Sequence, residues 1–344
     1  MSVSNSKITS RHKDFTIGDY YSRIKKYNQL LSLFNKINNY QCLKSFHKHG
    51  DNYFYEINDG LITLKRRIGS NSRYGVIFLS SNKINKTMFA TKLMIKDKHN
   101  HNEIIIAEKL SDIILTDKNP HFLLVFKHLE CHKSSSRDNN LPTIIKFDNY
   151  YICVNELVSG NLKQFINEHS KTPNFILNAF QQILIAILSF HYYTNGYFHN
   201  DCHYKNFLYH KITPGGYFHY QIFGKNVYIK NMGFIFIIWD FGLARSEPVY
   251  KEQHIKDYFR IIDFFDIYST SLNLSGNTRK STDLNINKIA RDILKFEDNY
   301  YNYFGHSDKI FFEKLIFKYP NLFLFSIDKK SKVINKKPYI IKDF

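Results

Sequence analysis

The fold of this chain is decided by the stretch Phe198-His199-Asn200-Asp201-Cys202-His203-Tyr204-Lys205-Asn206, which is followed downstream by Trp239-Asp240-Phe241-Gly242. The first stretch places Asp201 five positions before an asparagine, and the second places Asp240 before a Phe-Gly pair. A loop aspartate can accept a proton from a hydroxyl group, and carboxylate and amide oxygens are ligands that suit Mg²⁺. These residues together predict the acidic half of a site that aligns an acceptor and neutralises phosphate charge.

The order of these residues resembles the protein kinase superfamily. The segment from His199 to Asn206 resembles the catalytic loop H-R-D-L-x-x-x-N, and Asp240-Phe241-Gly242 matches the metal-binding D-F-G. The resemblance implies that Asp201 is the catalytic base and that Asn206 and Asp240 bind the metal. It also implies ATP and Mg²⁺ as cofactors.

A lysine upstream fits the same resemblance, although it played no part in the match. Phe89-Ala90-Thr91-Lys92 resembles V-A-I-K, and the alternation of a strand points Ala90 and Lys92 to the same face. The resemblance implies that Ala90 contacts adenine while Lys92 reaches the phosphates. The acidic partner of this lysine is expected to be Glu103 on the following helix, with Glu108 as the alternative.

Two further segments are expected to bind the nucleotide. Residues 68–76 resemble a glycine-rich loop that has lost its middle glycine, so small residues would replace part of the phosphate cradle. The cofactor-binding residues expected there are Ile68, Gly69, Ser70, Ser72, Gly75 and Val76. Asn155-Glu156-Leu157-Val158 looks like the connection between kinase lobes, where backbone groups around Glu156 and Val158 would bind adenine.

The resemblance implies an α+β chain with a bilobal kinase-like fold, in which a small β-rich N-lobe carries one main helix and a trimmed C-lobe is mainly helical. We expect an N-terminal extension over residues 1–60 with a helix near 20–37, an N-lobe over 61–155, and a C-lobe over 156–344 with a basic tail. Strands are expected at 74–79, 87–95, 121–128, 150–155, 217–223, 227–229 and 234–239. Helices are expected near 102–115, from Thr172-Pro173 to Asn195-Gly196, and near 254–268, 285–296 and 308–317.

Three departures from the family bear on regulation and substrate. Asn200 replaces the arginine that pairs with a phosphorylated activation loop, which implies that activity is not gated by that switch. His203 stands where protein kinases usually carry lysine, as it does in phosphotransferases that act on small molecules. No A-P-E follows Asp240, and if Asp257 is the buried aspartate that supports the catalytic loop, the activation segment is strongly shortened.

The bulk composition limits the partners only loosely. A formal net charge of +18 would attract a partner rich in phosphate or carboxylate. A bias toward amino acids with A/T-rich codons would explain the same charge without any partner. An acidic or nucleic-acid partner is therefore a secondary hypothesis. The four cysteines are scattered without a C-x-x-C pair, which suggests reduced thiols rather than a disulfide framework. We expect an intracellular protein without a membrane span.

The most concrete function that the sequence supports is transfer of the γ-phosphate of ATP to a serine or threonine of a protein substrate. A small-molecule kinase of the aminoglycoside or choline type is one alternative, and an inactive pseudokinase that acts as a binding module is another. The A/T-rich composition and trimmed C-lobe resemble serine/threonine kinases of large cytoplasmic DNA viruses. That likeness implies the host cytoplasm as the location, with association with the virion as a further expectation.

Overall fold

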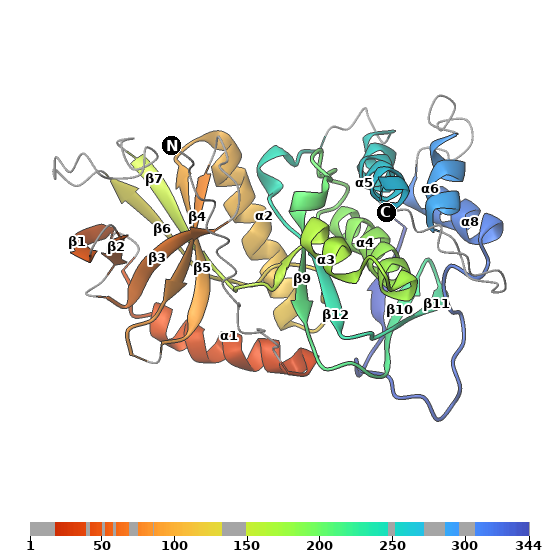
Figure 1. Cartoon of the computed structure of the whole chain (residues 1–344), viewed down its shortest axis with the longest axis horizontal. Coiled ribbons are helices and arrows are strands. Elements are labelled where there is room, and N and C mark those ends of the chain that lie inside the picture. The colour runs from red at the N-terminus through yellow and green to blue at the C-terminus, as the bar shows by residue number, and fades with distance from the viewer. Residues whose placement is uncertain are drawn as a thin grey trace, which may run out of the picture.

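The computed structural model describes residues 18–38, 42–49, 52–57, 60–68, 75–84, 86–132, 149–246, 252–271, 286–295 and 307–343. Over these residues the chain is a mixed α/β protein in which a curled sheet is followed by a mainly helical region (Figure 1). The described residues up to 155 are called the N-terminal part below, and those from 156 onward are called the C-terminal part.

The sheet of the N-terminal part has seven antiparallel strands in the order β1-β2-β3-β4-β5-β7-β6. They are β1 (Leu43–His49), β2 (Asn52–Ile57), β3 (Ile62–Ile68), β4 (Gly75–Ser81), β5 (Met88–Ile95), β6 (Val125–His132) and β7 (Asn149–Asn155). The helix α2 (Lys98–Leu115) connects β5 to β6 and is capped by Asp97, whose side chain accepts a hydrogen bond from the backbone N–H of Asn100 at 2.8 Å. The strand expected from residue 121 begins only at Val125.

The segment expected to form an N-terminal extension is packed into the same body. β1 and β2 extend the sheet, because β2 pairs with β3 in antiparallel register. The helix α1 (Tyr20–Phe34) runs alongside both parts (Figure 1). Tyr27 stacks on Phe126 of β6 at a centroid distance of 5.2 Å, whereas Tyr20 packs edge-on against Phe218 of the C-terminal part. The helix therefore bridges the two parts.

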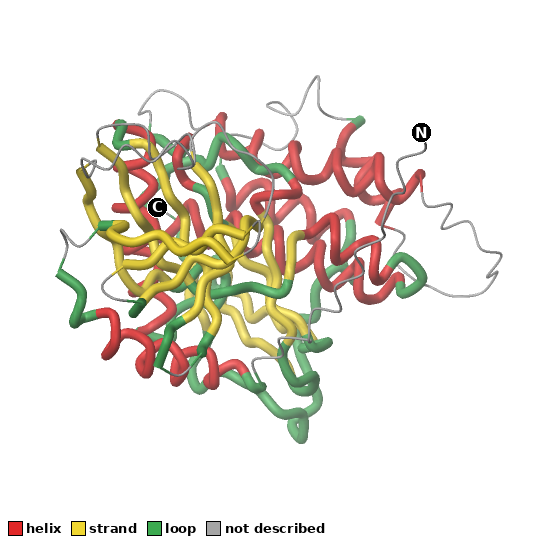
Figure 2. Tube along the Cα trace, turned by 60° about the vertical axis from the view of Figure 1, so that its left-hand side comes forward, coloured by secondary structure: helices red, strands yellow, loops and turns green. Residues whose placement is uncertain are grey.

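The C-terminal part combines helices with two small sheets, and Figure 2 shows its helices in red beside the yellow strands. Its helices are α3 (Leu162–His169), α4 (Pro173–Tyr193), α5 (Glu252–Ser271), α6 (Ile286–Leu294) and α8 (Asp308–Lys318). One sheet contains β8 (Gly160–Asn161), β9 (Phe207–Lys211) and β12 (Phe234–Ile238), and the other contains β10 (Tyr217–Ile222), β11 (Lys225–Lys230) and β13 (Tyr339–Ile341). The sequence predicted the long helices and β10 to β12, but not α3, β9 or β13.

The helix α4 forms the centre of the C-terminal part. It carries Pro173 in its first turn and ends where Asn195 and Gly196 take positive φ angles of 58° and 84°. By length and apolar composition it is the one described helix that could cross a membrane, but 78% of its most apolar window is buried inside the protein. Because α4 packs against α3, α5 and β12, its apolar character is explained by the core and is weak evidence for a membrane span.

The expectation of four reduced cysteines is wrong for one pair. Cys42 and Cys131 form a disulfide with a Cα–Cα distance of 5.5 Å, while Cys153 and Cys202 are buried free thiols. Cys42 precedes β1 and Cys131 lies on β6, and these strands are the two edges of the sheet. The pair meets because the sheet curls, a tertiary effect that the spacing of cysteines 89 residues apart does not reveal.

Candidate active site

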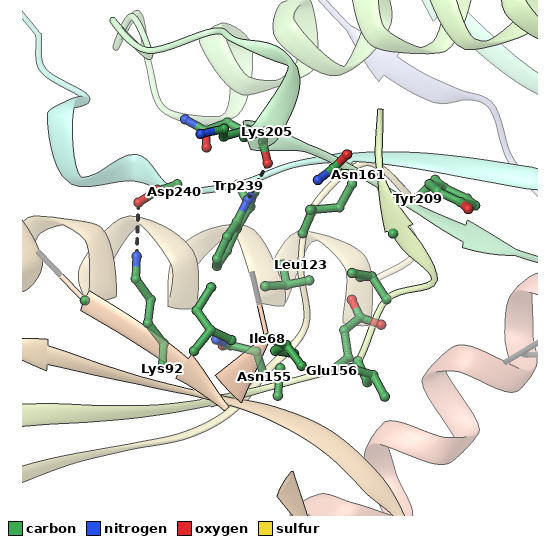
Figure 3. A pocket seen from close by; sticks show the side chains of 18 of the residues that line it. Ile68, Lys92, Leu123, Asn155, Glu156, Asn161, Lys205, Tyr209, Trp239 and Asp240 are labelled. Atoms are coloured by element: carbon green, nitrogen blue, oxygen red, sulfur yellow. Dashed lines mark hydrogen bonds and ion pairs between the residues drawn. The ribbon is translucent and has the colours of Figure 1, made fainter. Parts of the chain in front are cut away.

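A cleft of about 1180 Å³ lies between the N-terminal and C-terminal parts. Its walls come from β3, β4, β5 and α2 on one side and from α3, β9 and the 198–206 and 239–243 segments on the other. Figure 3 shows Lys92 pointing across this cleft to Asp240, with the Trp239 side chain between them and Leu123. One cavity is therefore lined by the residues expected to be catalytic or to bind the metal: Lys92, Glu103, Asp201, Asn206 and Asp240.

Lys92 is the centre of a buried ion cluster in this cleft. Its Nζ donates to Glu103 Oε1 at 2.6 Å and to Asp240 Oδ1 at 3.0 Å. The lysine comes from β5, Glu103 from the first half of α2, and Asp240 from the end of β12. Of the two glutamates that the sequence left open, Glu103 is the partner, because Glu108 pairs instead with His128.

The charges of this cluster are strongly coupled. Burial alone would lower the pKa of Lys92, but the Asp240 and Glu103 carboxylates outweigh burial and raise it. Burial raises the pKa of Glu103 to about 7, although Lys92 acts in the opposite direction. Burial also opposes ionisation of Asp240, yet the nearby Lys92 ammonium lowers the pKa of that carboxyl. The lysine thus faces one carboxyl whose pKa is lowered and another whose pKa is raised.

Asp240 is held in an uncommon backbone conformation. It follows β12, whose five residues are all buried, and it has φ 68° and ψ 69°, in the left-handed region. Such a conformation costs a non-glycine residue free energy and persists only where the surroundings enforce it. The backbone N–H of Trp239 donates to the Asn206 carbonyl at 3.1 Å, which joins this segment to the 198–206 loop.

Asp201 and Asn206 are positioned together in that loop. Asn206 Nδ2 donates to the backbone oxygen of Asp201 and to its Oδ2, each at 3.0 Å. These bonds use the amide nitrogen of Asn206, so its amide oxygen is the atom suited to bind a metal ion. Asp240 offers a carboxylate, and 33% of its side chain is exposed. An amide oxygen and a carboxylate fit the hard-oxygen preference of Mg²⁺. The Asp201 side chain, which is 29% exposed, is open to an acceptor.

The loop is supported from below by Asp257 on α5. This carboxylate, 1% exposed, accepts hydrogen bonds from the backbone N–H groups of His199 at 2.6 Å and Asn200 at 2.9 Å. Asn200, like Asp240, has a positive φ, of 62°. His191 adds a contact to Asp257 at 3.1 Å from α4. Asp257 therefore has the supporting position that the sequence predicted for it.

A second group of potential metal ligands lies in the core near Asp257. His191, His254 and Asp308 are buried, with ligand atoms within 4.8 Å of one another. The two imidazole rings are stacked, with centroids 4.3 Å apart and planes inclined by 18°. Ring nitrogens bind metals in the plane of the ring, so near-parallel stacked rings cannot both aim at one ion. We interpret this group as a hydrogen-bonded ion cluster, in which burial opposes the charge of His191 but the Asp308 carboxylate raises the pKa of its imidazole to about 9.

Several of the expected nucleotide-binding residues line the cleft: Ile68, Gly75, Ala90, Glu156 and Val158. Gly69, Ser70 and Ser72 lie outside the described residues. Gly75 has a clear steric reason, since a Cβ there would lie 3.0 Å from the Leu93 carbonyl oxygen and 3.1 Å from Lys92 Cε. A larger residue there would crowd the lysine side chain.

The expectation for Val76 is corrected by the register of β4. Lys92 pairs with Ile77 and Ala90 with Leu79, and Ile77 and Leu79 line the cleft with them. Val76 points to the opposite face, where it is buried in the hydrophobic core. Because side chains alternate along a strand, the residue two positions after Gly75 is the one that faces the cleft. The spacing G-x-V in the glycine-rich motif could have identified Ile77.

Glu156 is among the residues that line the cleft, but its carboxylate is bound by other protein groups. The carboxylate is bound by Arg23 of α1 and by His210 Nε2 at 2.9 Å, and the backbone N–H donates to the Leu124 carbonyl at 3.0 Å. Burial opposes ionisation, but Arg23 and His210 together hold the pKa of Glu156 at about 2. The N–H of Glu156 is therefore engaged within the protein and is not the group expected from the sequence to bind adenine.

Trp239 is a cleft residue that sequence reasoning missed. The Lys92 ammonium lies 5.1 Å from the centroid of its ring, and its Nε1 donates to the Lys205 carbonyl at 3.4 Å (Figure 3). Its position directly before Asp240, at the end of the buried strand β12, could have indicated that it lies at the cleft. Its indole adds to the aromatic surface of the cleft, which Tyr204 and Tyr209 also line.

Comparisons with known proteins add little to this geometry. No protein-family model matches the sequence, and no curated protein is similar enough to match. Among solved structures, the chain is similar to the kinase domain of BubR1, with 15% sequence identity and a TM-score of 0.37. The match covers 65% of this chain and 59% of that chain, so this protein spans less than two thirds of the length of its structural neighbour. So distant a likeness carries no argument about function, which has to be inferred from the residues of the cleft.

Proposed function

We propose that this protein is an ATP-dependent phosphotransferase with a bilobal, kinase-like fold, which transfers the γ-phosphate of ATP to a serine or threonine of a protein. The observation that carries the proposal is the meeting of Lys92, Glu103 and Asp240 in one ion cluster beside the hydrogen-bonded pair Asp201 and Asn206. These five residues come from four separate segments of the chain. A charged cluster that is partly buried and opens into a cleft is typical of a catalytic site.

On the donor side of the cleft, Lys92 would bind the phosphates of ATP while Glu103 fixes the direction of its ammonium group. Asn206 and Asp240 would hold Mg²⁺, which neutralises phosphate charge when it is bound. Ala90 and Ile77 offer an apolar surface for adenine. Because Lys92 bridges two carboxylates across the cleft, phosphate binding would exchange one of its ion pairs for another.

On the acceptor side, Asp201 would orient the hydroxyl and take up its proton. The hydroxyl oxygen forms the new bond to the γ-phosphorus, the bond from that phosphorus to the bridging oxygen of ADP breaks, and the proton passes to the Asp201 carboxylate. Asn206 holds Asp201 Oδ2 at 3.0 Å, which aims the carboxylate. The charge of the cluster, rather than covalent chemistry, supplies the catalysis.

A small-molecule acceptor is the second candidate, and a specific observation favours it. His203 replaces the lysine usual in protein kinases and lies with Nε2 3.5 Å from Asp201 Oδ2, as in a site adapted to another acceptor. The intact Lys92–Glu103 pair speaks against an inactive binding module. The resemblance to kinases of large cytoplasmic DNA viruses, and with it a location in the host cytoplasm, belongs to the same proposal.

The test incubates purified protein with γ-labelled ATP and Mg²⁺ and offers casein, basic proteins and a panel of amino-alcohols. Asp201→Asn should abolish transfer to every acceptor. Asp240→Asn should weaken Mg²⁺ binding and so raise the Mg²⁺ concentration needed for transfer. Asp112→Asn, which removes an exposed carboxylate from α2, serves as the matched control and should transfer phosphate like the wild type.

Label on proteins that disappears with Asp201→Asn supports the protein-kinase proposal. Label on amino-alcohols alone would replace it with the small-molecule function. ATP binding without label on any acceptor would indicate a binding module, and neither binding nor transfer would refute the proposal as a whole.

A further inference from the structure

A cation that the proposed transfer does not require lies beside Asp201. Arg260 of α5 has its Nη1 3.7 Å from Asp201 Oδ1, and it also donates to the backbone carbonyl of Asn200. The other carboxylate oxygen, Oδ2, lies 3.5 Å from His203 Nε2. The proposed base is therefore flanked by a guanidinium on one oxygen and an imidazole on the other.

The position of Arg260 follows from the way α5 supports the loop. Asp257 binds the backbone of His199 and Asn200, and Arg260 follows Asp257 by three positions, so both lie on the same face of the helix. Asp257 is buried under the loop, while Arg260 emerges at its edge.

These basic groups are accessible. The side chains of Arg260 and His203 are 51% and 44% exposed, and Lys205 beside them in the loop is also exposed. Among the described carboxylates, only Asp201 lies within ion-pair distance of Arg260. Asp201 has to meet the acceptor hydroxyl, so it cannot also neutralise this surface for a substrate. An approaching basic segment would be repelled, whereas a carboxylate would gain charge-assisted hydrogen bonds.

We propose that the acceptor is an acidic peptide segment, whose carboxylates bind Arg260, His203 and Lys205 while its serine or threonine meets Asp201. This inference rests on the proposed phosphotransfer and adds a substrate class to it. Arg260 would bind from the side of Asp201 away from the cleft, because it is not among the cleft-lining residues whereas His203 and Lys205 are. The acidic side chains would therefore lie on both sides of the acceptor residue.

The test measures binding and turnover separately. Three fluorescent peptides of equal length carry one central serine flanked by glutamates, glutamines or lysines, and their binding is followed by anisotropy at low and at physiological salt. We expect the glutamate peptide to bind about tenfold more tightly than the glutamine peptide at low salt, with the lysine peptide weakest. KM for phosphorylation should follow the same order.

Two variants locate the effect, and one controls for net charge. Arg260→Gln should reduce the preference for the acidic peptide severalfold. Because Arg260 also holds the Asn200 carbonyl, Lys205→Gln provides a second variant with no such contact, and it should reduce the preference in the same direction. Lys225→Gln removes one exposed charge from the remote β11 strand and should leave the preference unchanged.

Equal binding of the acidic and neutral peptides, or tighter binding of the basic one, would overturn the inference while leaving the phosphotransferase proposal intact. An acidic preference that survives both Arg260→Gln and Lys205→Gln would also overturn it, because net charge would then be the cause. Failure of the proposed function has a different signature: the acidic peptide binds in the expected order, but no acceptor receives label in an Asp201-dependent way.

Discussion

Two of the buried ion clusters in the described part of the chain each contain three ionisable side chains, and they differ in how they are completed. In the cluster at α1, Glu156 accepts from Arg23 Nε at 2.8 Å, from His210 Nε2 at 2.9 Å and from the Leu124 N–H at 2.7 Å, and its side chain is 8% exposed. In the cleft cluster, Lys92 holds Glu103 and Asp240, but the Asp240 side chain remains 33% exposed. One cluster is closed by protein groups, and the other is open on one side.

The direction of the pKa shifts separates the same two clusters. Glu156 is held at a pKa of about 2 because Arg23 and His210 overcome its burial, whereas burial raises the pKa of Glu103 to about 7. A buried carboxylate whose partners outweigh its burial is typical of a structural ion pair, whereas a carboxyl whose pKa is raised by burial is typical of a functional site. We therefore expect the α1 cluster to contribute mainly to stability and the cleft cluster to bind a ligand.

The largest effect is expected at the closed cluster. Arg23→Met leaves the Glu156 carboxylate buried without its main partner, and it should lower the free energy of unfolding by about 3–5 kcal/mol. Urea denaturation followed by fluorescence measures this loss. Replacing both partners, Arg23→Met with Glu156→Met, should cost clearly less than the sum of the single changes, because neither charge is then left alone. Additive costs would mean that the two residues are not coupled.

At the open cluster, the same kind of substitution should reduce activity more than stability. Lys92→Met removes the cation that would bind phosphate, so transfer should fall by about 10²–10³-fold. Glu103 can take up a proton once the lysine is gone. The free energy of unfolding should therefore fall by less than it does in Arg23→Met. The comparison would break down if Lys92→Met destabilised the protein as much as Arg23→Met does.

The closed cluster should also govern stability in acid. The pKa of Glu156 falls from a usual 4.5 to about 2 on folding, so between these values the unfolded chain binds the proton first. Its stabilising contribution is complete above about pH 4.5 and is lost as the pH falls toward 2. Thermal melting across this pH range should show a falling melting temperature. In Arg23→Met the melting temperature should depend less steeply on pH. An unchanged acid slope in that variant would assign the loss to other carboxylates.

The smallest effect is expected from two neighbours on β4 that face opposite ways. Val76→Ala removes apolar volume from the core and should cost about 1–2 kcal/mol of stability, with KM for ATP unchanged. Ile77→Ala, on the cleft face, should raise KM for ATP severalfold with a smaller stability cost. Calorimetry measures the stability of both variants, and steady-state kinetics measures their KM for ATP. The opposite pattern would place Val76 at the nucleotide.

Sequence reasoning succeeded where the chemistry is carried by residues close together in the chain. Asp201 and Asn206 share one loop, and Ala90 and Lys92 share one face of a strand, so local geometry alone brings each pair together. The long helices were predicted for a similar reason, since α4 carries its own start and stop signals. The catalytic and metal-binding roles of these residues remain predictions until transfer is measured.

Val76 and Trp239 were misjudged locally, but the other contacts that sequence reasoning missed depend on distant parts of the chain. The carboxylate of Glu156 is taken by Arg23, 133 positions away, and Cys42 meets Cys131 only because the sheet curls. Arg260 reaches Asp201 because α5 is anchored under the loop by a buried aspartate. None of these encounters leaves a periodic or motif signal, because each is set by packing between elements.

The bridging position of α1 has a consequence for how the protein is made. Its Arg23 binds Glu156, and the carbonyl of Gly18 accepts from the N–H of Thr213, so the first helix cannot dock until much of the chain has left the ribosome. At about 5–20 residues per second, this delay is on the order of ten seconds. During that time Phe34 can already pack against Phe89 of β5, whereas Tyr20 still lacks its neighbour Phe218. The helix α1 precedes every other described element, yet its packing is complete only after the C-terminal part has been made.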